Sequence, residues 1–182
     1  VAVKLLAETG LRRGEALALH WADIDFEKQT LWVHGTLART DKGLYVTSPK
    51  TQASVRQIHL PSHLVELLKS HLLAQSNEIV QAENKYVQKG FVFATRTGEP
   101  VDPRNLQRSV QIACKKAGLP IVSPHTLRHS AATTMLEAGI PIHVVSRQLG
   151  HSNINITVDI YGHVSDNGAK EAMETLGRLL ND

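Results

Sequence analysis

The sequence predicts a mainly helical α+β domain that carries one small antiparallel sheet of three strands. Apolar residues recur at helical spacing along most of the 182-residue chain, whereas an alternation of period two is confined to residues 30–60. Hydrophobic residues make up 42% of the chain, which is enough for one sizeable core. At this length we expect a single domain, residues 1–182.

Two helices are predicted before the sheet. Residues 1–8 are amphipathic and lead to Gly10, a residue type that commonly ends a helix. The segment "RRGEALALHW" begins a second helix that turns Ala16 and Leu17 toward the core, and "DID" then turns the chain.

Three short extended segments are the predicted strands of the sheet. They read "TLWVHG", "LYVTS" and "SVRQIHL", they alternate, and they are rich in branched and aromatic residues. Pro61 follows the last of them, and we expect Lys50 on or beside the hairpin that precedes it.

The remainder of the chain is predicted to be helical, apart from the short extended piece "GFVFAT". Leucines recur at helical spacing after Ser62, an expected N-cap, and this helix runs from residue 62 to about residue 87. The segment "DPRNLQRSVQIACKKAG" begins with a cap and a proline and ends in lysines, which is the usual helix polarity. Four further helices are expected in "SPHTLRHSAATTMLEAG", "PIHVVSRQLG", "NINITVDIYG" and "SDNGAKEAMETLGRLLND".

Composition limits the functional classes only loosely. The net charge of +3 permits a nucleic-acid partner without requiring one. The single cysteine, Cys114, excludes an internal disulfide and fits a reducing cytoplasm. No apolar run approaches the roughly 20 residues that cross a bilayer, and no signal peptide is evident, so we expect no membrane association. Because the chain opens without methionine inside a helix, we expect it to be part of a longer protein.

Four stretches in order carry a specific resemblance. They are "TGLRRGEALALHWADID", "SPKTQASVRQIHLP", "SPHTLRHSAATTMLEAG" and "LGHSNINITVDIY". Together they closely resemble the catalytic domain of the tyrosine recombinases, the phage and transposon integrase family, from the first residues to about Val164. The resemblance implies that catalytic-domain fold. It also implies site-specific recombination of DNA through a 3′-phosphotyrosyl intermediate, without metal, cofactor or ATP.

The resemblance also implies six catalytic residues, which are Arg12, Lys50, His125, Arg128, His151 and Tyr161. Two arginines suit a phosphodiester because a guanidinium stays charged and donates paired hydrogen bonds to phosphate oxygens. Tyr161 would be the nucleophile, and Lys50 the general acid for the departing 5′ hydroxyl. His125 would take or hold the proton of the phenol, and His151 would be a second phosphate donor. Glu15 is expected to orient arginines or to pack the start of its helix.

The partners implied by the resemblance are double-stranded DNA and further copies of the chain. We expect a homotetramer on two DNA sites, a monomer without DNA, and an upstream core-DNA-binding domain that this chain does not include. The terminal segment, residues 166–182, has an apolar stripe at helical spacing and is expected to dock on its own domain or on a neighbouring protomer. The expected setting is the cytoplasm of a prokaryote.

Three other interpretations remain open at the level of sequence. "HTLRH" places His125 and His129 at a zinc-binding spacing, although Thr126 stands where the base of such an enzyme would follow. Residues 135–161 have the rhythm of a helix-turn-helix, which would fit a DNA-binding module without catalysis. A type IB topoisomerase would use a similar set of residues to relax DNA without joining two sites.

Overall fold

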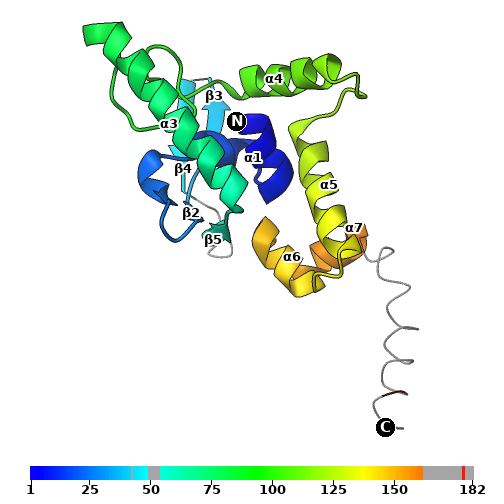
Figure 1. The fold of residues 1–182 in the computed structure, drawn as a ribbon. Helices are drawn as coiled ribbons and strands as arrows, with labels where there is room; N and C mark the ends of the chain where they lie inside the picture. Colours follow the sequence, from blue (N-terminus) through cyan, green and yellow to red (C-terminus); the bar gives the residue numbers. More distant parts are fainter. Residues whose placement is uncertain (42, 49–53, 162–177, 179–182) are drawn as a thin grey trace.

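The computed structural model describes residues 1–41, 43–48, 54–161 and 178, and these residues are mainly helical (Figure 1). The α-helices are α1 (Ala2–Thr9), α2 (Arg13–Ala18), α3 (Ser62–Ala82), α4 (Pro103–Lys116), α5 (Pro124–Glu137), α6 (Ile142–Leu149) and α7 (Ile154–Tyr161). Two 3-10 turns, η1 (Trp21–Asp23) and η3 (Glu83–Lys85), follow α2 and α3. The predicted fold class is confirmed. The predicted terminal helix, residues 166–182, lies outside the described residues apart from Arg178.

Local sequence signals account for the ends of these helices. The side chain of Asp102 accepts the backbone N–H of Arg104 at 2.8 Å and caps α4, which has a proline as its first residue. Gly10 and Gly150 end α1 and α6 in the left-handed conformation, with φ of 67° and 68°. A non-glycine residue adopts this conformation at a cost in free energy, so the positions of the two glycines determine where α1 and α6 end.

The strands form two antiparallel units, and this corrects the predicted pairing. A three-stranded sheet is present, in the order β1 (Ile24–Asp25), β2 (Thr30–Val33), β5 (Arg56–His59). The predicted strand "LYVTS" is not part of it, because β4 (Gly43–Thr47) pairs with β3 (Thr36–Thr40) in a separate hairpin. Thr40 pairs with Gly43, so β4 pairs with the strand that precedes it in the sequence, and β5 pairs with β2 instead.

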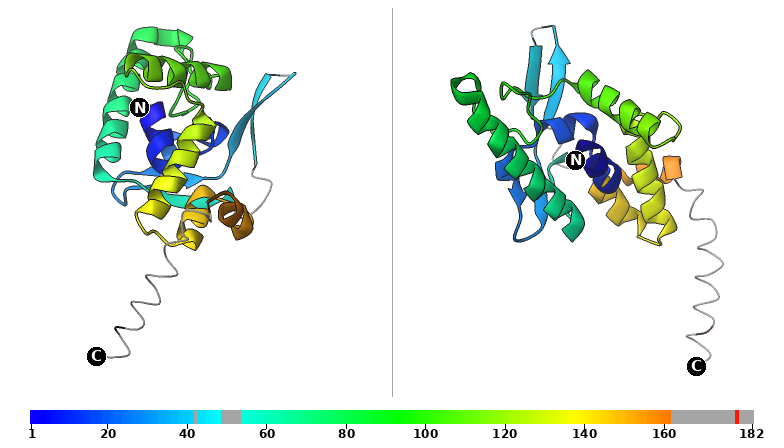
Figure 2. Two further views of the ribbon diagram at one scale, coloured as in Figure 1. Left: turned by 90° about the vertical axis from the view of Figure 1, so that its right-hand side faces the viewer. Right: turned by 45° about the horizontal axis from the view of Figure 1, so that its top comes forward.

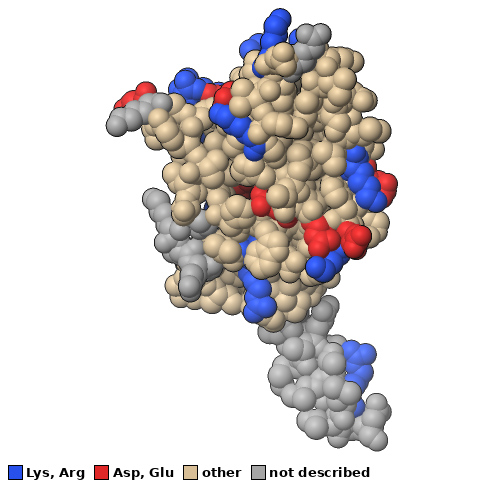
Figure 3. Space-filling view, turned by 90° about the vertical axis from the view of Figure 1, so that its left-hand side faces the viewer, with Lys and Arg blue, Asp and Glu red and all other residues tan. Residues whose placement is uncertain are grey.

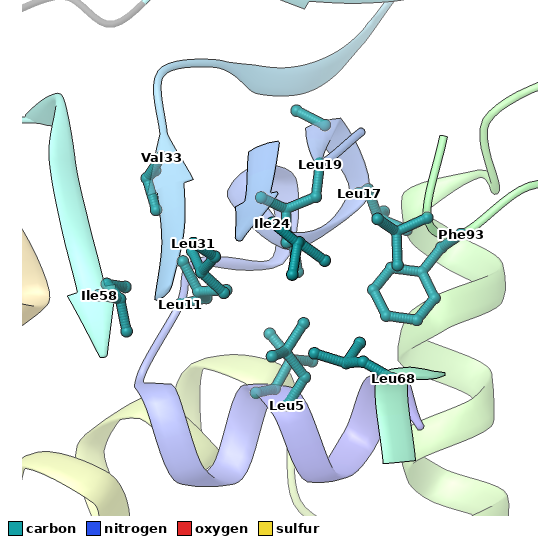
Figure 4. Close-up of a cluster of buried hydrophobic side chains, with 14 of the residues drawn as sticks. Leu5, Leu11, Leu17, Leu19, Ile24, Leu31, Val33, Ile58, Leu68 and Phe93 are labelled. Carbon is teal, nitrogen blue, oxygen red and sulfur yellow. The ribbon is translucent and has the colours of Figure 1, made fainter. Parts of the chain in front are cut away.

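The main hydrophobic core lies between α1, α2, the three-stranded sheet and α3 (Figure 4). Its fully buried side chains include those of Leu5, Leu11, Leu17, Leu31, Ile58 and Leu68. A smaller cluster of Ala132, Val145 and Leu149 joins α5 to α6. Leu149 is the last residue of α6, so burial of its side chain anchors the end of that helix.

Helices α5, α6 and α7 gather at one end of the domain, while the β3–β4 hairpin extends away from its body (Figure 2). Helix α6 packs against α5, α7 and β5, and α1 packs against α5. The end of α6 therefore lies close to segments that are far apart in the sequence.

The face that is on the left in Figure 1 has basic and acidic side chains interspersed among uncharged ones (Figure 3). Among the described residues, no helix combines the length and the apolarity that a bilayer crossing requires.

Candidate active site

Three arginines donate hydrogen bonds to three successive carbonyl oxygens at the end of α6. The pairs are Arg56 with Gln148 (2.7 Å), Arg128 with Leu149 (2.8 Å) and Arg12 with Gly150 (3.3 Å). The last carbonyls of a helix lack intrahelical partners and carry a partial negative charge, so they attract cations. The start of α2, strand β5 and helix α5 are thereby joined directly before His151.

Arg12 is held firmly although much of its side chain is accessible. Its backbone N–H donates to Oε2 of Glu15 at 2.8 Å, and its Nη1 donates to Oε1 of the same carboxylate at 2.8 Å. The side chain of Arg12 is 44% exposed, whereas that of Glu15 is 5% exposed. An arginine held in this way can still meet a ligand from solvent.

Arg128 is buried and connects three helices. It is 5% exposed and lies on α5. Its Nη2 donates to the carbonyl of Leu149 at the end of α6. Its Nη1 donates at 2.7 Å to the carbonyl of Gly10, the residue that ends α1. Its guanidinium is therefore fixed in position before any ligand binds.

One cavity of about 450 Å³ brings Arg12 and Arg128 together with His125. The Nε2 atom of His125 lies 2.8 Å from Nε2 of His129, one helical turn further along α5, and the rings meet edge to face. Partial burial, with smaller effects of His125 and Arg128, lowers the pKa of His129. The short contact requires an N–H of one imidazole to donate to the ring nitrogen of the other.

His151 follows the end of α6 and is held by α7. Its Nδ1 lies 2.7 Å from the hydroxyl of Thr157, which is fully buried. Burial, followed by the charges of Arg128, Arg12 and Arg56, lowers the pKa of His151 to about 4. The imidazole is therefore neutral at neutral pH. It lines a second cavity together with Arg56 and Trp32.

Of the two remaining predicted residues, only the backbone of Tyr161 is described. Tyr161 is the last residue of α7, a helix that packs against α6 and α5, but its side chain lies outside the described structure. Lys50 lies outside the described residues, between β4 and β5. The structure thus brings Arg12, His125 and Arg128 together and sets His151 beside them.

Arg56 is a residue of this site that the motifs did not identify. It is 5% exposed, and its Nη1 and Nη2 donate to the two oxygens of Glu15 at 3.1 and 3.0 Å. Burial by itself would raise the pKa of Glu15, but Arg56, together with Arg12, outweighs it and holds this pKa below its ordinary value. A sequence signal existed: in a strand of alternating burial, Arg56 occupies an inward position like Ile58.

The described residues contain no cluster of three or more histidine, cysteine or acidic side chains that would hold a metal ion. His125 and His129 are close together, as the zinc spacing suggested, and their contact is with each other.

Comparison with known proteins places this arrangement in context. The model of the phage integrase family matches residues 1–168. A tyrosine recombinase XerC-like protein from Caldanaerobacter subterraneus is 42% identical over 94% of this chain and 47% of its own length. The tyrosine recombinase XerA of Pyrococcus furiosus is 34% identical, over 98% of this chain and 54% of its own. The chain spans about half the length of these curated relatives.

Solved structures of an integrase and of a recombinase also superpose on this chain. The Tn1549 transposon integrase in complex with transposon right-end DNA superposes with a TM-score of 0.80 at 29% identity, covering 97% of this chain and 58% of that one. A XerA recombinase structure superposes with a TM-score of 0.65 at 28% identity, covering 96% and 56%.

Proposed function

Because this chain belongs to the phage integrase family, we propose that it is the catalytic part of a site-specific DNA recombinase. It cleaves one strand of double-stranded DNA, holds the 3′ phosphate on Tyr161, and transfers it to a 5′ hydroxyl of a second duplex. The observation that carries the proposal is the convergence of Arg12, Arg128 and His125 on one cavity, next to the α6–α7 turn that bears His151.

Charge is the main problem of this reaction. A DNA phosphodiester is a monoanion, and in-line attack turns it into a five-coordinate phosphorus with about one further negative charge. Two guanidiniums stay charged at any working pH and donate to the non-bridging oxygens. By comparison with other preorganised donors, each contributes about 2.7 to 4 kcal/mol to the transition state. His151 adds a further hydrogen bond to a phosphate oxygen.

The bonds formed and broken balance without an external energy source. The phenol of Tyr161 loses its proton toward His125, and its oxygen forms a bond to phosphorus as the bond to the 5′ oxygen breaks. Lys50 gives a proton to that oxygen. Because a phenol has a pKa of about 10, it is a better leaving group than an alkoxide, so an incoming 5′ hydroxyl can reverse the step.

The partners are proposed from this chemistry and from the resemblance to the family. We propose double-stranded DNA as the substrate and four copies of the chain on two DNA sites, with only some tyrosines active at a time, in the cytoplasm of a prokaryote. Residues 166–182 would link the copies. No cofactor is needed, because the arginines supply the charge that a metal ion would otherwise provide.

The test begins with a pool of nicked duplexes that carry a randomised core. Protein is incubated with the pool in the presence of a chelator, and DNA that stays attached in detergent is recovered and sequenced. Wild-type protein is expected to enrich one sequence as a covalent adduct, and Tyr161→Phe is expected to bind that sequence without forming the adduct. A Tyr161→Phe variant that still forms the adduct, or a wild-type protein that forms none, refutes the proposal.

A second assay separates recombination from topoisomerase activity. The enriched site is supplied on two differently labelled duplexes. Joining between the two labels supports a recombinase, whereas relaxation of a supercoiled plasmid without such joining supports the topoisomerase reading.

A further inference from the structure

We propose that Arg56 is a positioning residue of this reaction, which sets Arg12 and His151 without touching the DNA itself. This inference rests on the proposed function. It starts from a difference between Arg12 and Arg56: the side chain of Arg12 is 44% exposed, but that of Arg56 is only 4% exposed. Arg128 is as buried as Arg56, but it lines the cavity that also contains Arg12, whereas Arg56 does not.

The protein already uses most of the hydrogen-bonding capacity of Arg56. Its Nε donates to the Gln148 carbonyl at 2.7 Å, its Nη1 to Glu15 at 3.1 Å and to the Ser54 carbonyl at 3.3 Å, and its Nη2 to Glu15 at 3.0 Å. These contacts occupy four of the five N–H groups of a guanidinium. Arg56 therefore joins α2, β5 and α6, and it has little capacity left for a phosphate.

Glu15 transmits the effect of Arg56 to Arg12. Each oxygen of this one carboxylate accepts from both arginines: Oε1 from Nη1 of Arg12 at 2.8 Å and from Nη1 of Arg56, and Oε2 from the backbone N–H of Arg12 and from Nη2 of Arg56. Two cations share one anion, so about one positive charge remains, at the exposed Arg12. Without Arg56, the carboxylate would instead neutralise Arg12 and hold it away from a phosphate.

Gly150 connects Arg56 to His151. A Cβ at position 150 would lie 2.7 Å from Nη1, 2.9 Å from Cζ and 3.1 Å from Nε of Arg56, so the chain passes directly over the guanidinium. The same residue offers its carbonyl to Arg12 and precedes His151. The position of the Arg56 plane therefore sets where the turn runs and where His151 begins.

The experiment measures cleavage of the selected nicked duplex in a single turnover at saturating protein, and the dissociation constant of the same DNA separately. Arg56→Met is expected to slow cleavage about 10- to 100-fold with little change in the dissociation constant, as for other small misplacements of catalytic groups. Arg56→Lys keeps the charge but not the paired hydrogen bonds, so its cleavage rate is expected to lie between those of wild type and Arg56→Met. Lys89→Met removes a surface cation that is paired with Glu99, and serves as the control with wild-type rate.

A double variant distinguishes positioning from general support of the fold. Glu15→Gln combined with Arg56→Met removes the carboxylate that would neutralise Arg12, so it is expected to cleave faster than Arg56→Met alone. If Arg56 only supports the fold, the double variant should lose as much cleavage rate as Arg56→Met, or more. That result would overturn the proposal, as would a loss confined to DNA affinity or a wild-type rate in Arg56→Met.

A readout that does not require cleavage keeps this inference separate from the proposed function. The ¹⁵N NMR signals of the Arg12 side chain and of the His151 ring, recorded without DNA, are expected to move in Arg56→Lys and not in Lys89→Met. If wild-type protein forms no adduct, the proposed function fails, and these signals alone decide whether Arg56 positions the two residues. Unchanged signals in Arg56→Lys reject the positioning role of Arg56. If Arg56→Met does not fold, Arg56→Lys, alone and combined with Glu15→Gln, provides the kinetic comparison.

Discussion

Arg128 donates to the carbonyl of Leu149 at 2.8 Å, two residues before His151. A buried cation on α5 thus holds the last residue of α6, and the same cation holds the end of α1 through Gly10. This connection makes Arg128 both a structural element and a proposed catalytic group, while Arg12 is mainly the latter. The two arginines should therefore respond differently to substitution.

Arg12→Ala and Arg128→Ala are both expected to slow formation of the covalent adduct by about 100-fold or more, because each removes a preorganised donor. Only Arg128→Ala should also lower the free energy of unfolding strongly, by on the order of 3 kcal/mol, since it leaves two carbonyls without their donor. Urea unfolding and single-turnover cleavage measure the two effects. Equal losses of stability in both variants would contradict this division.

His151 is expected to be neutral above about pH 5 in the DNA-free protein, because its pKa is lowered to about 4. An unfolded histidine titrates near 6.5. Between these values the unfolded chain binds more protons, so stability should fall as the pH is lowered from about 6.5 toward 4. Glu15, whose pKa is also lowered, adds to the loss in more acidic solution.

NMR titration of the His151 ring tests this directly, and urea unfolding at several pH values tests the linkage. In His151→Gln the slope between pH 6.5 and 4 should be smaller than in wild type. A His151 that titrates at its ordinary value would show that the pocket does not exclude its charge.

Gly150→Ala is expected to destabilise the protein more than Gly139→Ala does. Both glycines have a left-handed backbone, with φ of 68° and 78°, so both substitutions carry the same conformational cost of about 1–2 kcal/mol. A Cβ at Gly139 meets nothing within 4 Å, whereas a Cβ at Gly150 meets the guanidinium of Arg56. The difference between the two unfolding free energies therefore measures the contact with Arg56, and equal values would mean that the turn relaxes away from it.

Lys50→Ala is expected to slow cleavage of ordinary DNA by about 100-fold or more, as for loss of a general acid. Replacing the 5′ bridging oxygen of the scissile phosphate by sulfur should restore the rate, because a thiolate leaves without being protonated. Arg12→Ala is the control: sulfur at the bridge should not rescue it, since Arg12 acts on the non-bridging oxygens. A Lys50→Ala variant that sulfur fails to rescue would assign the general acid to another residue.

Local signals in the sequence predicted much of this structure. Helix caps, a proline at the start of α4 and a glycine after α1 act on their immediate neighbours, so their effects can be read from short segments. The pairing of β4 with β3 was not predicted, because alternation marks a segment as a strand without naming its partner.

The sequence by itself determined the family motifs, the helices that carry them and the candidates Arg12, His125, Arg128 and His151. Only the tertiary structure decided that arginines up to 138 positions from their acceptors meet at the end of α6, and that a buried Arg56 lies beneath Gly150. The physical reason is that a buried cation needs acceptors and a helix end needs donors, and packing of distant segments alone determines which of them meet.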